Sequence, residues 1–393
     1  MFLQLGSIRA LVVSSAEIAK EVLKTHDAFF VDRPTPNACK QVFRHSKDVL
    51  FSPYGDHWRK LRGILVHQLL NSKTVKSFTS IIEEETALLV KNITYNSTSP
   101  INLKDMFMMF TSDVICRSAF GKKLSEKEHG KRFLKLMNKG IGLVINLTIG
   151  EFIPWLSWMN RLNGFDVAVG KIVKIRDEVL GAIIQEHLDS ETCGNDGNLI
   201  DTWLHICKDE TPNAPINMDT VKALILDVMA AATETSAVTL EWAMTELIRH
   251  PTVMRKLKDE VRGNSNGQQN ITAHDLEKMH YLKAVIKETL RYHPPIPLYS
   301  RESREDVDLM KLRHFKGFDF QFIPFGAGRR SCPGISFAIA SIEHVLANLI
   351  HEFDWELPDG AKGEDLDVTE RPGLSVGKKN PLIVVATKKK YTT

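Results

Sequence analysis

The chain has 393 residues, of which 43% are hydrophobic and 25% are charged, and it is long enough to bury a large core in one large domain or two. Its net charge of +3 is too small to indicate nucleic-acid binding. The five cysteines are scattered and include no C-x-x-C pair, which argues against a disulfide scaffold or a zinc site.

The N-terminal residues have neither a charged region nor a cleavage site typical of a signal peptide. No run of apolar residues approaches the roughly 18 that a membrane-spanning helix needs. We therefore expect the chain as written to carry no membrane anchor.

The first part of the chain predicts a strand pair over residues 2–13 and then a helix to about residue 26, with a capping box at 14–17. Trp58 and Arg62 are four apart on a helix that opens near residue 54, so they share one side of it. Apolar residues then recur at helical spacing over 73–92, 103–120, 126–147, 165–188 and 217–250. The polar stretch 189–198 is expected to be a flexible loop within one domain.

The second part predicts a connecting helix to about residue 263, a helix over 282–292 and a strand-like segment over 296–309. A long helix over 335–351 follows, and the chain ends in two short strands, 373–376 and 382–386. The expected fold class is therefore mainly α with a small β-sheet.

A glycine-rich loop over residues 325–334, Phe-Gly-Ala-Gly-Arg-Arg-Ser-Cys-Pro-Gly, carries a single cysteine directly before the long helix. The N–H groups and the positive dipole end of that helix would favour a thiolate at Cys332 over a thiol. Arg329 and Arg330 favour the same charge state. We interpret Cys332 as a metal ligand. A flat cofactor could approach the loop backbone where there is no Cβ, at Gly326, Gly328 and Gly334.

Two pairs of polar residues lie within predicted helices. Glu234 and Thr235 lie inside the long helix over 217–250, where hydroxyl groups compete for the i−4 carbonyl, so we expect a local opening there. Glu288 and Arg291 are three residues apart on another helix, which favours an ion pair between them.

The loop pattern Phe-x-x-Gly-x-Arg-x-Cys-x-Gly resembles the haem-binding loop of the cytochrome P-450 family, and Glu288-x-x-Arg291 is similar to the second signature of that family. The resemblance extends through nearly the whole chain and is strongest to plant microsomal members that oxidise specialised metabolites. It implies the cytochrome P-450 fold, with haem b between the long helix and the loop and an axial thiolate from Cys332. Phe325, Gly326 and Gly334 would belong to the haem-binding loop, and Glu288 and Arg291 would form a buried structural pair.

The resemblance also assigns roles to other residues. Thr235 and Glu234 match the distal-helix motif that delivers protons during oxygen activation, although Ala232 stands where the family usually has glycine. Guanidinium groups clamp carboxylates and stay charged when buried, and the residues that match the family's haem propionate partners are Trp58, Arg62, Arg301 and Arg330. The substrate pocket would draw on Ala231, Ala232 and the turn at 374–376.

The implied activity is that of a haem-thiolate monooxygenase, which inserts one oxygen atom from O2 into a small hydrophobic organic substrate. Electrons would come from NADPH through a flavoprotein reductase, docked by Arg59, Lys60 and Arg329. The family's plant members imply the cytosolic face of the endoplasmic reticulum membrane. Two alternatives remain open: a related isomerase or dehydratase that needs no dioxygen, and a truncated helical protein that binds haem weakly or not at all.

The resemblance covers residues 1–393 as a single domain that lacks two parts of the family pattern. An N-terminal anchor and a proline-rich hinge would precede Met1. A second gap is expected between Met310 and Lys311, because Glu288 and Cys332 are several dozen residues closer than in the family. The skipped part would include two strands and the arginine that completes the Glu-x-x-Arg pair into a triad; Arg313 is the nearest substitute.

Overall fold

The computed structural model describes residues 1–43, 47–97, 99–126, 128, 130–131, 148–189, 198–207, 216–265, 268, 270–305 and 320–389. The chain divides into two compact units. Unit 1 contains Met1–Gln68, Leu124–Ala230 and Leu298–Pro333. Unit 2 contains Leu69–Lys123, Ala231–Pro297 and Gly334–Thr393. Most of the predicted helix over 126–147, most of the predicted loop over 189–198 and the Met310–Lys311 junction with Arg313 lie outside the described residues.

Unit 1 begins with an antiparallel pair of strands, β1 (Phe2–Leu5) and β2 (Ile8–Leu11), as predicted. The next helix, α1 (Ala16–Lys20), is capped by Ser15, whose Oγ accepts a hydrogen bond from the Ile18 N–H at 3.3 Å. The predicted capping box, which began one residue earlier, is therefore wrong. The chain continues as a π-helical turn, η1 (Glu21–Thr25), which packs against the turn before Cys332, η6 (Gly328–Arg330).

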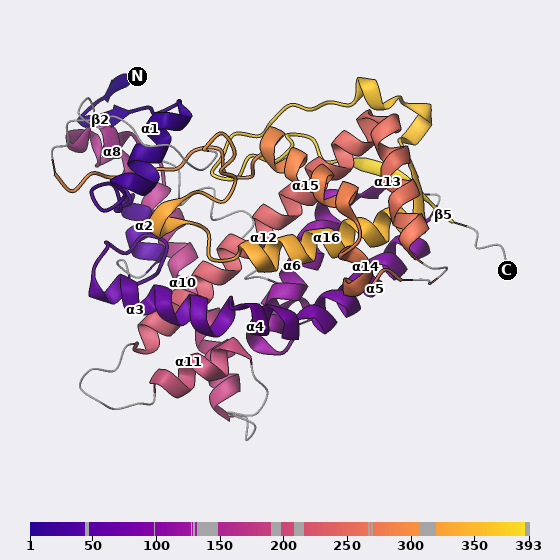
Figure 1. The fold of residues 1–393 in the computed structure, drawn as a ribbon. Helices are drawn as coiled ribbons and strands as arrows, with labels where there is room; N and C mark the ends of the chain where they lie inside the picture. The colour runs from indigo at the N-terminus through magenta and orange to yellow at the C-terminus, as the bar shows by residue number, and fades with distance from the viewer. Residues whose placement is uncertain are drawn as a thin grey trace. The chain divides into compact units, whose positions relative to one another are not determined.

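Among the described helices that lie wholly within unit 1, α10 is the longest, and it contacts α2, α9 and α11 (Figure 1). It packs against α2, where Arg176 Nη1 donates to the Gln41 carbonyl at 2.8 Å. The helices are α2 (Asn37–Val42), α3 (Asp56–Ile64), α8 (Ile149–Phe152), α9 (Met159–Leu162), α10 (Phe165–Asp189) and α11 (Leu199–Cys207). Short 3-10 turns join them at η3 (Leu124–Glu126) and η4 (Pro154–Leu156), and a π-helical turn, η2 (Leu65–Leu69), extends α3.

The longest helix, α12 (Met218–Arg249), crosses from the sequence of unit 1 into that of unit 2 without a break. The Thr235 hydroxyl donates to the Ala231 carbonyl at 2.6 Å, yet the backbone stays helical on both sides. The expected local opening is therefore wrong. Within the described residues, α12 alone has the length and apolar composition to cross a membrane. Of its most apolar 18-residue stretch, 72% is buried inside the structure.

Unit 2 is built around α16 (Ile335–Glu352), which contacts α5, α13 and α15 (Figure 1). Val345, Leu346, Leu349 and Ile350 of this helix are fully buried. The predicted helix over 73–92 is two helices, because the backbone turns at Phe78. The other helices of this unit are α4 (Ser72–Ser77), α5 (Thr79–Tyr95), α6 (Leu103–Phe120), α13 (Pro251–Asn264), α14 (Ala273–Leu276) and α15 (His280–Tyr292).

A three-stranded antiparallel sheet closes unit 2 in the order β3 (Ile101–Asn102), β5 (Ile383–Lys388) and β4 (Phe353–Glu356). The register pairs Ile101 with Val384 and Trp355 with Ala386. The sequence predicted β5 but missed β3 and β4. The predicted strand over 373–376 is wrong, since these residues form bends closed by a single bridge between Glu370 and Lys378. Residues 296–305 likewise form one bridge, Asp32 with Glu302, and no strand.

Candidate functional site

The Cys332 loop of unit 1 is closed by hydrogen bonds within the chain. The Cys332 N–H donates to the Phe325 carbonyl at 2.8 Å, and both residues are half-buried. Tyr299 supports the loop from the preceding segment: its hydroxyl donates to the Ile323 carbonyl at 2.6 Å and accepts from the Gly326 N–H at 3.2 Å. The cysteine is thus held in a defined loop directly before α16.

The three glycines of this loop have different structural roles. Gly328 has a φ of 71°, and a Cβ there would lie 1.9 Å from the Leu23 carbonyl oxygen. Gly328 therefore permits η6 to pack on η1, and the approach of a cofactor to its backbone stays a prediction. Gly326 also has a left-handed φ, 67°, which favours glycine. Gly334 has a φ of −91°, and its carbonyl accepts the first hydrogen bond of α16 from the Ala338 N–H at 2.9 Å.

Two guanidinium groups lie close to Cys332. Arg62 Nη2 donates to the Ser331 carbonyl at 2.6 Å, next to the cysteine. Arg33 Nη1 donates to the Leu50 carbonyl at 3.1 Å. Burial lowers the pKa of Arg62 and of Arg33, and the nearby Cys332 sulfur opposes this effect at both residues. Arg33 was not predicted, because a single arginine before a proline carries no signal in the sequence.

Trp58 and Arg330 were predicted from distant parts of the sequence, and the structure brings them together. The Arg330 guanidinium lies 4.6 Å from the centre of the Trp58 ring. Trp58 Nε1 and Arg330 Nη1 both donate to the Val49 carbonyl, at 3.0 and 3.1 Å. Arg330 also donates to the carbonyls of Val31 at 2.9 Å and Ser52 at 2.5 Å. These donors therefore fix the two side chains on the protein itself.

Positive charge accumulates around these residues. Burial lowers the pKa of Arg301 and of Arg330 to about 10, and Arg33 contributes to both shifts by like-charge repulsion. The acidic groups that oppose this charge within unit 1 are Asp27, Asp32, Asp48 and Asp227. Asp48 and Asp227 both have raised pKa values because they are buried, so they supply less negative charge than their number suggests. The cluster of Arg33, Arg62, Arg301 and Arg330 suits a ligand that carries carboxylates.

In unit 2, the predicted proton-delivery residues are held by other groups of the same unit. Glu234 Oε1 accepts from Arg371 Nη2 at 2.6 Å, and the Thr235 hydroxyl donates to the Ala231 carbonyl at 2.6 Å. Ala231 is exposed, while Ala232 is half-buried. Arg371 was not predicted, since it lies more than a hundred residues after Glu234.

The segment 367–380, which contains the predicted substrate turn at 374–376, is fixed on α12. Trp242 Nε1 donates to the Val376 carbonyl at 3.1 Å, and the Val376 N–H donates to the Pro295 carbonyl at 2.9 Å. The Arg371 N–H donates to the Gly377 carbonyl at 2.8 Å and closes the segment on itself. The turn and the distal-helix residues therefore belong to one connected part of unit 2.

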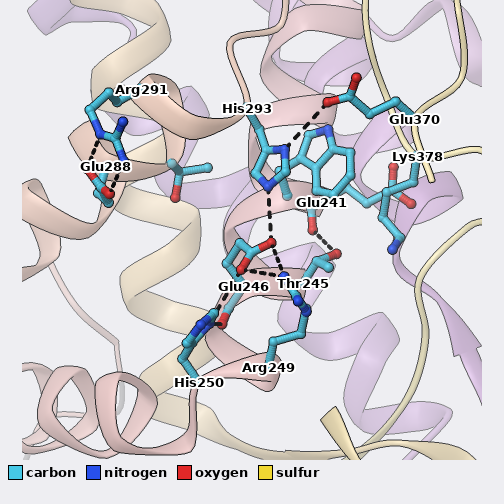
Figure 2. Close-up of polar contacts among 12 residues, drawn as sticks. Glu241, Thr245, Glu246, Arg249, His250, Glu288, Arg291, His293, Glu370 and Lys378 are labelled. Atoms are coloured by element: carbon cyan, nitrogen blue, oxygen red, sulfur yellow. Dashed lines mark hydrogen bonds and ion pairs between the residues drawn. The ribbon is translucent and has the colours of Figure 1, made fainter. Parts of the chain in front are cut away.

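The predicted Glu288–Arg291 pair is formed but lies on the surface. Figure 2 shows the two side chains facing each other, with two hydrogen bonds of 2.7 Å. Their side chains are 63% and 55% exposed, so the expectation of a buried pair is wrong for this chain. The same view shows a separate network in which His293 faces Glu246, with its Nε2 3.0 Å from Glu246 Oε1. The His293 ring also stacks on that of Trp242.

The residues predicted to dock a reductase are less positive than the sequence suggested. Arg59 forms an ion pair with Asp56, and Arg329 forms one with Asp27. Lys60 is exposed beside Arg59 on α3. Because two carboxylates offset two of the three cations, the docking role stays a prediction.

Comparisons with known proteins find matches over almost the whole chain. The family model for Cytochrome P-450 matches residues 1–317 and 311–385. Cytochrome P-450 736A117 of Prunus mume is 44% identical, over 98% of this chain and 83% of that protein. The tabersonine/lochnericine 19-hydroxylase of Catharanthus roseus is 41% identical, over 98% and 86%. Norfluorocurarine oxidase of a Strychnos species is 39% identical, over 99% and 86%.

Solved structures agree in fold. A zebra fish cytochrome P-450 with progesterone has a TM-score of 0.83 at 20% identity, and covers 98% of this chain and 96% of its own. A structure of a zebra fish cytochrome P-450 with abiraterone has a TM-score of 0.81 at 21% identity, over 99% and 95%. At these identities the likeness shows the fold alone.

Proposed function

Because this chain belongs to the cytochrome P-450 family, whose members are monooxygenases that carry haem on a cysteine thiolate, we propose that Cys332 is the haem ligand. The observation that carries this proposal is the hydrogen bond from Arg62 to the Ser331 carbonyl, which places one guanidinium next to Cys332. Arg33, Arg301 and Arg330 add positive charge in the same unit, and burial raises the pKa of two of the four aspartates that oppose it, Asp48 and Asp227. Haem b, which carries two carboxylates, would supply the missing negative charge.

The residues of unit 1 would hold haem in complementary ways. Arg62 and Arg33 are close to Cys332 and would favour its thiolate form. Arg301 would act on the haem carboxylates. Arg330, which backbone carbonyls hold over the Trp58 ring, would add positive charge near them. Phe325 and Gly326 would shape the loop beside the macrocycle, and Gly334, with which the next segment of unit 2 begins, would end it.

When bound, haem supplies the activation of dioxygen and the insertion of one oxygen atom into the substrate. The protein's own contribution would be proton delivery by Thr235 and Glu234. Arg371 holds the Glu234 carboxylate at 2.6 Å, and this ion pair would keep the carboxylate on the side of α12 that faces segment 367–380. The hydroxyl of Thr235 would have to leave the Ala231 carbonyl in order to donate a proton elsewhere.

We propose a small hydrophobic plant specialised metabolite as the substrate. Two relatives at about 40% identity are named as an oxidase of norfluorocurarine and a 19-hydroxylase of tabersonine and lochnericine. Ala231, Ala232 and the turn at 374–376 lie in the same unit, and the hydrogen bond from Trp242 to Val376 fixes that turn. These residues would set the shape of the substrate site.

We propose NADPH and a flavoprotein reductase as the electron source, and the cytosolic face of the endoplasmic reticulum membrane as the location. Both are what the resemblance to plant members of the family implies. Lys60, with Arg59 and Arg329, remains the proposed docking face. Omission of NADPH or reductase from a reconstituted assay should abolish product formation, whereas a P-450-like isomerase or dehydratase would continue to turn over.

We also propose that the chain lacks an internal segment after Met310. The family model matches two stretches that meet near this junction, 1–317 and 311–385. The alignment with the Prunus mume relative spans 431 positions, more than the 393 residues of this chain, so that relative contains residues that this chain lacks. The exposure of Glu288 and Arg291 is what loss of a covering segment would leave.

The decisive test of the function is the carbon monoxide difference spectrum of the reduced, haem-reconstituted protein. A red-shifted Soret band is expected for the chain and for a Cys207→Ser control, and it should be lost in Cys332→Ser. Absence of the band in the unmodified chain would favour the alternative of a helical protein that binds haem weakly or not at all. Sequencing of the mature transcript across the Met310–Lys311 junction tests whether the segment is missing because of a gene-model error. Codons for Met310 and Lys311 that are adjacent in the mature transcript would refute such an error.

A further inference from the structure

Two buried aspartates of unit 1, Asp48 and Asp227, accept hydrogen bonds from backbone N–H groups of one loop, residues 48–52. Asp48 lies in the loop before α3 and is 0% exposed, while Asp227 lies on α12 and is 6% exposed. The Val49 N–H donates to Asp227 Oδ2 at 2.7 Å, and the Phe51 N–H donates to Asp48 Oδ2 at 3.0 Å. In each carboxyl group the other oxygen, Oδ1, is buried and has no hydrogen-bond partner within the described part of the chain.

The electrostatic surroundings do not favour two full negative charges. Burial raises the pKa of Asp48 to about 6 and raises that of Asp227 as well, and the charge of Asp48 adds to the second shift. Two like charges in a poorly solvated site cannot both ionise at low cost. The groups that face the pair from neighbouring elements are Arg33 and Arg330, which favour ionisation, and Cys39, whose own pKa burial raises to about 12.

The loop that carries Asp48 also carries the carbonyl groups that orient the arginine cluster. Val49 accepts from Trp58 and Arg330, Leu50 accepts from Arg33, and Ser52 accepts from Arg330. The N–H of Val49, in the same loop, donates to Asp227 on α12. This hydrogen bond holds the loop on α12 and so helps to orient the side chains of Trp58, Arg33 and Arg330.

We propose that Asp48 and Asp227 share one proton between their Oδ1 atoms, and that this pair positions residues 48–52 on α12. With one proton the pair carries a single negative charge, so the arginine cluster keeps an excess of positive charge. That this excess of positive charge favours the binding of the haem carboxylates rests on the proposed function, whereas the shared proton does not. Both aspartates are positioning residues and contact no reacting atom.

The first test compares the full chain with Asp48→Asn and Asp227→Asn in urea unfolding between pH 4.5 and 7.5. Asparagine mimics the protonated acid, and it keeps an acceptor for the backbone N–H. Each native carboxyl with a raised pKa binds a proton that the unfolded chain has released, so the stability of the wild type declines as the pH rises from about 4 through about 6. The unfolding midpoints of the asparagine variants should therefore rise relative to wild type towards pH 7.5.

Asp219→Asn is the matched control, since Asp219 lies on the same helix and pairs with Lys47 at a half-exposed site. Its midpoint should follow the pH dependence of the wild type. A midpoint difference that does not change with pH in either buried variant would overturn the shared proton. Asparagine variants that lose stability relative to wild type as the pH rises would show two ionised carboxylates paired with Arg33 and Arg330, and would also overturn it.

The second test measures haem titration into the apo forms of Asp227→Leu and Asp227→Asn. Leucine removes the acceptor for the Val49 N–H, so we expect at least about tenfold weaker haem binding, while asparagine should restore it to within about threefold. Equal affinity in both variants would overturn the positioning role. If the unmodified chain binds no haem, the proposed function fails, but the pH test still decides the shared proton.

Discussion

The guanidinium of Arg330 lies 4.6 Å from the centre of the Trp58 ring, although the two residues are far apart in the sequence. Arg330 also donates to three backbone carbonyls, those of Val31, Val49 and Ser52. A lysine could not serve three acceptors in this planar arrangement. The residue therefore fixes the loop before α3 as well as the approach to Cys332.

Arg330→Lys should lower the free energy of unfolding by about 3 kcal/mol, because it leaves buried carbonyls without donors. Urea unfolding of the full chain measures this. Arg329→Lys is the control: Arg329 is 42% exposed and pairs with Asp27 at the surface, so its change should stay below about 1 kcal/mol. Equal costs for the two variants would contradict the hydrogen-bond pattern.

Gly328→Ala should destabilise unit 1 strongly, because the new Cβ would lie 1.9 Å from the Leu23 carbonyl oxygen at a φ of 71°. We expect a loss of about 3 kcal/mol from the clash and the strained backbone together. Gly360 has the same φ of 71°, but a Cβ added there would meet no described atom within 4 Å, so Gly360→Ala should cost only about 1 kcal/mol. Thermal unfolding of both variants separates the clash from the backbone strain.

Glu288→Gln should change the free energy of unfolding of this chain by less than about 1 kcal/mol, since the Glu288–Arg291 pair is exposed. The same substitution in a chain with the proposed missing segment restored should cost about 3–5 kcal/mol, as for a buried ion pair that loses a partner. The comparison by urea unfolding tests the missing segment at the protein level. A small cost in both chains would show that the segment does not cover this pair.

Burial lowers the pKa of His344 on α16 from 6.5 to about 4. The unfolded chain therefore binds a proton before the folded chain does, and stability is lost as the pH falls from 6.5 towards 4. His344→Leu should reduce the loss between pH 7.5 and 4.5 by roughly 2 to 3 kcal/mol, measured by urea unfolding at both values.

Arg371→Met removes the partner of Glu234, and we expect a smaller share of the consumed NADPH to yield product. The two side chains are 41% and 28% exposed, so the free energy of unfolding should change by less than about 1 kcal/mol. Lys379→Met, an exposed change in the same segment, serves as the control. Unchanged coupling of NADPH use to product in Arg371→Met would separate Glu234 from proton delivery.

The sequence by itself determined the family, the cysteine loop and most helices. Helices such as α6 and α12 follow from local apolar spacing, and the Cys332 loop is one continuous stretch whose residue types are each visible in the chain. The pairing of Trp58 with Arg62 on α3 likewise needed only the helical repeat. These features depend on neighbours in the sequence.

The tertiary structure alone decided where the donors of the site point. Arg33 entered the cluster because the fold brings it close to Cys332, and Arg371 reached Glu234 from a distant segment. The surface position of Glu288 and Arg291 and the reason for Gly328 depend on what packs against them. The hydrogen bonds of Arg330 and the hydrogen bond from Val49 to Asp227 join segments that no periodicity connects, because long-range contacts follow from the packing of whole elements and not from residue spacing.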